Sequence, residues 1–320
     1  LTSLIVASFS IPTIETFKGS LYLIRLVLYS MMFLIVYQLK ERKEFAPELF
    51  KVYLVTGVIF ALVGLTQFIF FPNFDQLTLF GYDPHQSRLA STFLDPNFAG
   101  AFLIFVIAIL ISQKSLFQEK VLSLTILFLL ISSLILTFSR SAYLTTIIFI
   151  ILLAVTKWKK FLLLIPVILL LILFVPRVQE RIMGGFSLDK SASARVESWQ
   201  NGLTISGRAP FIGIGFNTLR YAQQQLNLIK PYSTDGGHAG SGIDSSFLLV
   251  LATTGVVGFT IYLWFWLRVF IKLFAKKNSI ALISGCFLIS LLINSQFINS
   301  LFYPPLMLSY FSLLGLVYEE

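Results

Sequence analysis

Three arginines in weakly charged surroundings are the residues of this sequence best suited to bind an anion. Arg140 stands in LTFSRSAYL, Arg195 opens RVESWQNGLTISGRAPFIGIGFNTL, and Arg88 opens RLASTFLDPNFAGAF. A guanidinium group stays charged and offers a planar fork of donors that matches two phosphate oxygens. The three are therefore candidate ligands of a phosphorylated substrate. For Arg140 the alternative is a side chain that reaches out of the membrane and marks a helix end.

Candidate proton acceptors lie in a fourth segment, GGHAGSGIDSSFLLVLATTGVVGF. It contains His238 and Asp244, and Asp244 stands where the next apolar run begins. A carboxylate or an imidazole at this place can take a proton from an acceptor hydroxyl. Asp244 and Ser245 can equally cap the free amides of that helix. Asp95, in the Asp-Pro-Asn signal of the 88–102 segment, is expected to be an ordinary helix cap.

The sequence predicts neither a metal site nor a nucleotide site. His85 and His238 lie on different loops without metal-binding spacing, and Cys286 is the single cysteine, so zinc ligands and an intrachain disulfide are not expected. The Gly213–Gly215 pair belongs to no phosphate-binding loop motif. It instead predicts close approach of the backbone to a ligand or a neighbouring strand. No cofactor is expected.

Apolar segments make up most of the chain. Of its 320 residues, 57% are hydrophobic, and the mean hydropathy is +0.85, which predicts an all-α, polytopic membrane helix bundle. The chain begins at Leu1 with no basic segment before its first apolar run, so no signal peptide is evident, and a longer parent chain is compatible with this. We expect nine spanning helices and a weaker tenth at 1–16, which Pro12 and Glu15 interrupt. The nine are 21–39, 51–71, 97–113, 121–138, 141–156, 160–176, 243–267, 279–299 and 303–318.

Lysine and arginine divide between the two sides that these spans define. The short loops of one side carry Lys40, Arg42, Lys43, Lys51, Lys114, Lys120, Lys157, Lys159, Lys160, Arg268, Lys272, Lys276 and Lys277. This side is therefore expected to be cytoplasmic, and the net charge of +9 needs no nucleic-acid partner to explain it. The other side, with its helix ends, carries mainly arginine: Lys18, Arg25, Arg88, Arg140, Arg177, Arg181, Lys190, Arg195, Arg208, Arg220 and Lys230.

A long polar segment on the arginine side divides the chain into three parts. We expect an N-terminal helix bundle at 1–176, a large extracytoplasmic loop at 177–242 and C-terminal membrane helices at 243–320. Within the loop, Val196, Trp199, Leu203 and Ile205 recur at near-helical spacing. This pattern predicts an amphipathic helix at the outer membrane surface.

The four quoted segments, in this order and at this spacing, resemble the O-antigen ligase / O-antigen polymerase superfamily of bacterial envelope glycan enzymes. The resemblance runs from about 88 to 260. It implies an undecaprenyl-pyrophosphate-linked glycan donor, transfer to a sugar hydroxyl with inversion and without a metal, and a pyrophosphate held by Arg140 and Arg195, with Arg88 as a further candidate. Ligases of the family usually carry a His-Asn pair where this chain has Asp244-Ser245. The catalytic base is therefore left open between Asp244 and His238, and a polymerase is mildly favoured over a ligase.

The sequence thus predicts a multi-pass glycosyltransferase of the bacterial cytoplasmic membrane whose site faces outward. Its partners would be the lipid-linked donor, a glycan or lipid-glycan acceptor and membrane lipid. The main alternative is a lipid-linked glycan flippase or an anionic-solute transporter, and a purely structural subunit is a third. Transporters place polar sites near the membrane midplane, where only Asn294 and Gln296 are notable, and these are expected to hydrogen-bond between helices.

Overall fold

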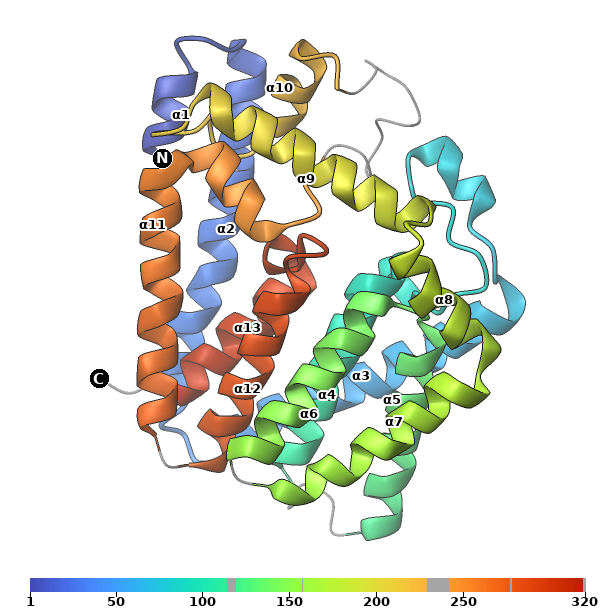
Figure 1. The fold of residues 1–320 in the computed structure, drawn as a ribbon. Coiled ribbons are helices and arrows are strands. Elements are labelled where there is room, and N and C mark those ends of the chain that lie inside the picture. Colours follow the sequence, from blue (N-terminus) through green and yellow to red (C-terminus); the bar gives the residue numbers. More distant parts are fainter. Residues whose placement is uncertain (114–118, 157, 229–241, 277, 319–320) are drawn as a thin grey trace.

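Helices account for the architecture of the chain (Figure 1). The computed structural model describes residues 1–113, 119–156, 158–228, 242–276 and 278–318, and within these ranges no β-strand is formed. Three helices are long and apolar enough to cross a membrane: α2 (Thr13–Leu39), α3 (Phe45–Phe70) and α11 (Ser246–Ala275). The shorter apolar helices are α4 (Pro96–Ser112), α5 (Lys120–Leu136), α6 (Arg140–Thr156), α12 (Ser279–Asn294) and α13 (Pro304–Val317). The all-α fold with membrane helices is confirmed, and the number of spans stays a prediction.

Three expected spans differ from the helices that form. The 1–16 run gives only α1 (Thr2–Ala7), after which Pro12 precedes the first turn of α2. The 160–176 run gives a 3₁₀ turn (η3, Lys159–Leu163) and α7 (Leu164–Phe174). Eleven α-helical residues rise only about 17 Å, well short of a bilayer core. Helix α11 extends to Ala275, so Arg268 and Lys272 belong to its last turns and not to a loop.

Helix α4 forms the centre of the bundle. Nearly all of its side chains are buried, and α3, α5, α6, α12 and α13 contact it. The helix begins where Asp95 accepts hydrogen bonds from the amides of Asn97 and Phe98, at 2.6 and 3.3 Å. Pro96 suits the first helical position because its missing N–H would have no partner there. The cap predicted at Asp95 is therefore confirmed, and it fixes the polar entrance of the central helix.

A break in α11 explains the glycine pattern of the preceding loop. At Gly255 the helix leaves α-helical geometry, with φ 67° and ψ −174°, and the 210–215 segment packs into the gap. Ile214 N–H donates to Ala252 O at 3.0 Å, and Val256 N–H donates to Pro210 O at 2.8 Å. A Cβ atom on Gly255 or Gly213 would lie 2.3 Å from the facing backbone. The close approach predicted for the 213–215 pair is thus to a broken helix rather than to a strand.

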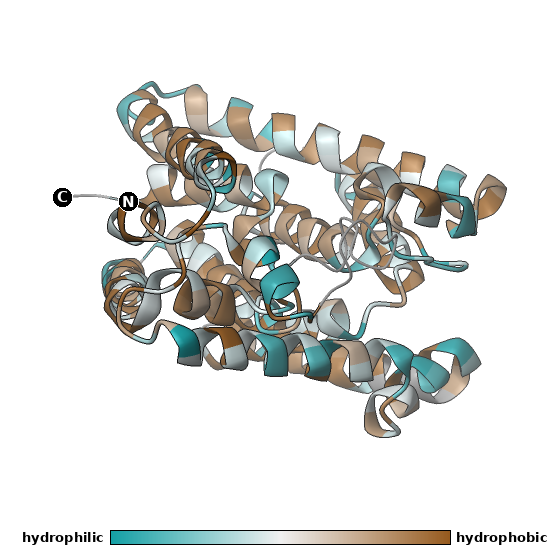
Figure 2. Ribbon diagram, turned by 90° about the horizontal axis from the view of Figure 1, so that it is seen from above, coloured by the Kyte–Doolittle hydropathy of each residue, from teal (hydrophilic) through white to brown (hydrophobic). Residues whose placement is uncertain are grey.

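The arginine-rich segment covers one end of the bundle. Helices α8 (Pro176–Phe186), α9 (Lys190–Arg208) and α10 (Leu219–Gln225) gather there with α1, while α2, α6 and α11 end at the opposite side (Figure 1). We call the covered side the α9 end. Seen from above, the helices are mainly hydrophobic, and hydrophilic residues are interspersed along α9 (Figure 2). The described part of the 177–242 loop is therefore helical and joined to α11, and the three-part domain division stays a prediction.

Candidate active site

The turn between α5 and α6 is held by arginines from two other segments. Thr137 O accepts a hydrogen bond from Arg88 Nε at 2.9 Å, and Phe138 O accepts one from Arg181 Nε at 3.3 Å. Phe138 has a positive φ of 46°, which is uncommon for a residue with a side chain. The Arg177 guanidinium lies 4.5 Å above its ring. These contacts fix the turn, and Arg140, two residues after Phe138, begins α6.

Arg140 is engaged by a carboxylate that the sequence did not single out. Its Nη1 and Nη2 atoms donate to Asp189 Oδ2 and Oδ1 at 3.1 and 2.9 Å, which is the bidentate geometry of a strong charge-assisted pair. Arg181 Nη1 lies 3.9 Å from the same carboxylate. Asp189 also caps α9 by accepting from Ala192 N–H at 2.9 Å. Partial burial opposes ionisation, but Arg140 and this amide together hold the pKa of Asp189 below its usual value.

The inner face of α9 carries Arg195, Ser198, Gly202 and Ile205. Ile205 is fully buried, and Gly202 lies directly against Ile243, whose Cδ1 atom would lie 2.9 Å from an added Cβ atom. The spacing of three, four and three residues places the four on one helical face. A helix forms where the amphipathic one was predicted, but its inner face is different, since Val196 and Leu203, which were expected to be part of it, are exposed. Its position at the outer membrane surface stays a prediction. Arg195 consequently lies on the side of α9 that packs on the bundle.

Asp244 lies opposite Arg195 with its carboxylate uncommitted. The backbone of Asp244 is fixed on both sides, since its N–H donates to Ser198 Oγ at 2.9 Å and its carbonyl accepts from Trp199 Nε1 at 3.0 Å. Ser245, not Asp244, caps α11 by accepting from Leu248 N–H at 3.2 Å. The alternative of Asp244 as a cap is therefore wrong. Its side chain forms no hydrogen bond with any of the described residues.

Burial and neighbouring charges shift the pKa values of this pair. Burial raises the pKa of Asp244 to about 6, the charges of Asp95 and Asp83 add to the rise, and Arg195 acts against it. Burial also lowers the pKa of Arg195, with Asp244 opposing that change and Arg140 adding to it. The Arg195 guanidinium donates no hydrogen bond to the described part of the chain. The site therefore presents a free cation beside a carboxylate that is more basic than usual.

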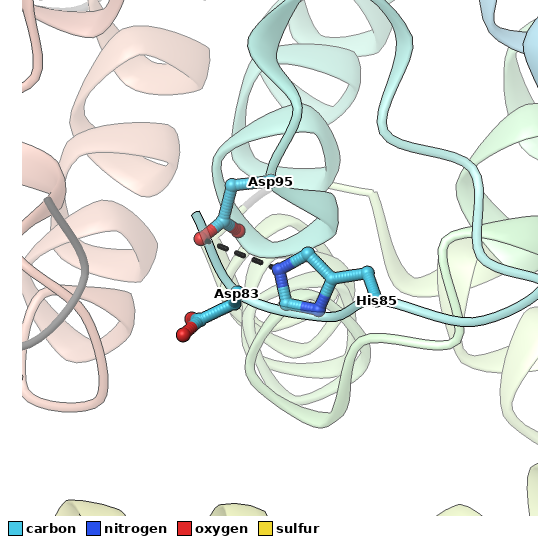
Figure 3. A group of neighbouring side chains, drawn as sticks. All are labelled: Asp83, His85 and Asp95. Carbon is cyan, nitrogen blue, oxygen red and sulfur yellow. Dashed lines mark ion pairs between the residues drawn. The ribbon is translucent and has the colours of Figure 1, made fainter. Parts of the chain in front are cut away.

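Arg88 lies in the loop before α4, next to a group of three titratable side chains, Asp83, His85 and Asp95 (Figure 3). It is 8% exposed, and Nη2 lies 3.4 Å from Asn97 Oδ1 while Nη1 lies 3.4 Å from His85 Nδ1. Arginine only donates, so Nδ1 must accept and the ring proton lies on Nε2. That nitrogen faces Asp95 Oδ2 at 3.9 Å. Burial, together with the charges of Arg181 and Arg195, lowers the pKa of Arg88 to about 9, and Asp95 acts against this change.

Asp83, His85 and Asp95 have the composition of a cation site but not its surroundings. One ligand atom from each lies within 4.8 Å of the others. A metal on His85 Nε2 would need the ring proton on Nδ1, where Arg88 offers another donor and no acceptor. Oδ1 of Asp95 already accepts from two helix amides, and Oδ2 is directed at the ring proton of His85. The residues therefore do not fit a metal, and we interpret the cluster as an electrostatic network that positions the loop beside the site.

A large apolar cavity reaches the α9 end from within the bundle. It has a volume of about 680 Å³ and is lined by α4, α5, α6, α7 and α8. At one end it is lined by Tyr143, one helical turn from Arg140, and by Ile182, which follows Arg181 in the sequence. Its opposite end is lined by Lys120 and Lys160. An elongated hydrocarbon could therefore lie in the cavity with a polar head beside the arginines.

The structure brings most of the predicted site residues to one end of the bundle. The charges of Arg140, Arg195 and Asp244 are close enough to interact, and Arg88 lies beside them in a more buried network. His238 lies outside the described residues. Sequence analysis missed Asp189 as the partner of Arg140 and counted Arg181 only among many arginines. An acidic residue just before a predicted helix was the available signal for Asp189, but it indicated a cap and not an ion pair.

The α5–α11 region matches a known family. The model of the O-antigen ligase family matches residues 125–263, which include Arg140, Arg195 and Asp244. This match confirms the resemblance of the chain to the O-antigen ligase / O-antigen polymerase superfamily. No curated protein matches the chain. The family match and the three long apolar helices together indicate a membrane protein.

Proposed function

We propose that the chain is a membrane glycosyltransferase of the O-antigen ligase/polymerase type. It transfers a glycan from an undecaprenyl-pyrophosphate donor to a hydroxyl of a glycan or lipid-glycan acceptor, without a metal and with inversion. The reaction takes place at the outer face of the bacterial cytoplasmic membrane. One observation carries the proposal: Arg195 and Asp244, from separate segments, lie close enough for their charges to interact, and no described residue hydrogen-bonds to either charged group.

The donor diphosphate binds to the arginines. Its departure from the sugar leaves negative charge on a phosphate oxygen, and cations already in place stabilise that charge without reorganising. Arg195 is free to do so, and Arg140 lies close enough for the two charges to interact. Arg88 adds positive electrostatic potential and holds the turn between α5 and α6. It does not bind the diphosphate directly, because its guanidinium already donates to Thr137 O and is directed at Asn97 and His85.

Asp244 acts as the base for the acceptor. The hydroxyl proton passes to the carboxylate while the hydroxyl oxygen forms a bond to the anomeric carbon. The bond from that carbon to the diphosphate oxygen breaks at the same time, and the leaving group keeps the electron pair. A single displacement of this kind inverts the anomeric configuration. A pKa of about 6 leaves Asp244 ionised at neutral pH and more basic than an ordinary aspartate.

The polyprenyl chain of the donor occupies the apolar cavity. The cavity begins beside the arginine-held turn, and most of the side chains that line it further along are apolar. This arrangement keeps the diphosphate at the edge of the bundle while the hydrocarbon stays out of water.

A transporter explains the site less well. Asn294 Nδ2 donates to Thr145 Oγ1 at 3.1 Å, so this midplane polar residue joins α12 to α6. Ser245 Oγ lies 3.4 Å from Gln296 Oε1, which places Gln296 at the start of α11. Both residues are used in helix packing, and the uncommitted charges lie at the α9 end.

An assay with purified protein and lipid-linked oligosaccharide tests the proposal. In detergent, without a membrane to cross, the chain should lengthen or transfer the glycan, and the Asp244→Asn variant should not. A protein that yields no new glycosidic bond in detergent but moves the labelled lipid across proteoliposomes is a flippase, and this outcome contradicts the proposal.

A further inference from the structure

We infer that the pocket formed by Arg140 and Arg181 is an anion site that the chain's own Asp189 occupies, and that a phosphate of the donor displaces this carboxylate on binding. The inference rests on the proposed function for the identity of the anion. It adds Arg181 to the diphosphate-binding residues and gives Asp189 the role of an internal competitor.

The geometry of Asp189 is that of a bound anion. Both of its oxygens accept from the Arg140 fork, at 2.9 and 3.1 Å, and Arg181 Nη1 lies 3.9 Å from Oδ2. A phosphate offers two oxygens at comparable spacing and a third for the second arginine. A diphosphate that binds Arg195 nearby would therefore find Arg140 and Arg181 correctly directed once the carboxylate has moved.

The pocket carries more positive charge than Asp189 neutralises. The charges of Arg140, Arg181 and Arg195 interact, and those of Arg140 and Arg195 lower the pKa of Arg181 in addition to the effect of burial. Asp189 and Asp244 are two carboxylates beside these three guanidinium groups, so one cation stays uncompensated, and two do once Asp189 has moved away. A ligand with at least two negative charges satisfies this group of arginines better than Asp189 does.

Asp189 lies at the corner between α8 and α9, where the backbone is fixed by its own hydrogen bonds: the Asp189 N–H donates to Gly184 O at 2.9 Å and the Ser187 N–H to Met183 O at 3.0 Å. Leu188 has a positive φ of 51°, and Phe186, Ser187 and Leu188 are exposed. Gly185 packs against the Arg140 side chain and Gly184 against Asp189, so a Cβ atom at either position would crowd the pair. A rotation of the Asp189 side chain, with this backbone in place, would release the Arg140 fork to a diphosphate.

The alternative is that Asp189 simply fastens α9 to α6. The two roles predict opposite effects when only the charge is removed. A fastening residue would lower anion affinity when neutralised, because Arg140 would lose its orientation. A competitor would raise anion affinity.

The test is calorimetric titration of the purified full-length chain with sodium pyrophosphate. Asp189→Asn and Asp189→Ser both keep an oxygen that can cap α9, so each should fold. Both should bind pyrophosphate about fivefold more tightly than the wild type, the size expected of a partly exposed ion pair. Glu15→Gln is the matched control: it also removes one negative charge, from the exposed Lys18 pair, and should leave the affinity unchanged.

Arg181→Ala should weaken pyrophosphate binding in the wild type and abolish the gain seen with Asp189→Asn. The inference is overturned if both Asp189 variants bind pyrophosphate no more tightly than the wild type. It is also overturned if neither the wild type nor the Asp189 variants bind pyrophosphate at all. Tighter binding by the variants in a chain that transfers no glycan contradicts only the proposed function. Transfer with unaltered pyrophosphate affinity contradicts only the competitor role of Asp189.

Discussion

At the residue scale, the site depends on the opposite charges of Arg195 and Asp244. Contacts of the surrounding backbone position these two residues, and no hydrogen bond joins them. Ser198 and Trp199 fix the backbone of Asp244, and Ser245 takes over the capping of α11. The carboxylate is thereby left for chemistry. Arg195 approaches it because Gly202 allows α9 to pack closely on Ile243.

The pH dependence of transfer should report Asp244. Because the pKa of Asp244 is raised to about 6, the group is ionised at neutral pH and becomes protonated, and inactive as a base, as the pH falls through 6. We expect kcat/KM to be level above about pH 7 and to fall about tenfold per pH unit well below 6. Initial rates with lipid-linked donor across pH 4.5–8 measure this.

The Asp244→Asn variant should lose about 10²- to 10⁴-fold in rate and should no longer show the acidic limb. His238→Ala should cost less than Asp244→Asn. An acidic limb that persists in the asparagine variant, or the opposite ranking of the two variants, would transfer the role of base to another group.

The role of a residue was predictable from the sequence where its interaction is local. Its interaction partners from distant segments were not predictable. Asp95 as a cap follows from the Asp-Pro-Asn order. Arg140 was recognisable as an isolated charge, but its partner Asp189 is 49 residues away, and nothing local pairs them. The sequence offered both Asp244 and Ser245 as caps of α11 because Asp and Ser are equally good caps, and only Ser245 takes that role.

At the element scale, the broken helix α11 joins the loop to the bundle. The 243–267 run contains no proline and was expected to be one continuous span. The break arises from a long-range event, in which the 210–215 backbone enters and takes over hydrogen bonds at Gly255. In α9 the helix itself was predictable from periodicity, but the apolar pattern alone misplaced its inner face. Arg195 and Gly202 belong to that face, and neither counts as hydrophobic.

Gly255→Ala should therefore destabilise the protein. A methyl group there would lie 2.3 Å from the Phe211 backbone, and the φ of 67° with ψ −174° is accessible essentially to glycine alone. We expect a loss of at least about 2 kcal/mol in the free energy of unfolding. Thermal unfolding in detergent, followed by circular dichroism, measures it.

Gly207→Ala is the matched control within α9, since no atom lies within 4 Å of the added carbon and the residue is helical. It should leave stability unchanged or raise it by about 0.5–1 kcal/mol. Equal melting temperatures for the Gly255→Ala variant and the wild type would show that α11 can close into a continuous helix.

At the scale of the whole molecule, the division between lysine and arginine predicts a direction across the membrane. The ends of α2, α6 and α11 next to the lysine-rich segments lie opposite the α9 end (Figure 1). Lysine in short loops marks the cytoplasmic side, so α9 should face outward.

Cysteine labelling checks this orientation, because the native Cys286 is buried and should not react. In right-side-out vesicles, a membrane-impermeant maleimide should label Arg208→Cys directly. It should label Lys43→Cys only after the vesicles are opened; both positions are exposed. The reverse pattern would place the site on the cytoplasmic side and contradict the proposed use of an outward-facing donor.

The most direct test of the central claim is the rate of glycan transfer by Arg195→Ala compared with Arg208→Ala. Both variants remove one arginine from α9, but Arg208 is exposed and Arg195 faces Asp244. Because Arg195 donates no hydrogen bond to the described residues, its loss should leave folding intact. We predict a fall of at least about 100-fold for Arg195→Ala and near wild-type transfer for Arg208→Ala. Full transfer by a correctly folded Arg195→Ala protein would contradict the account.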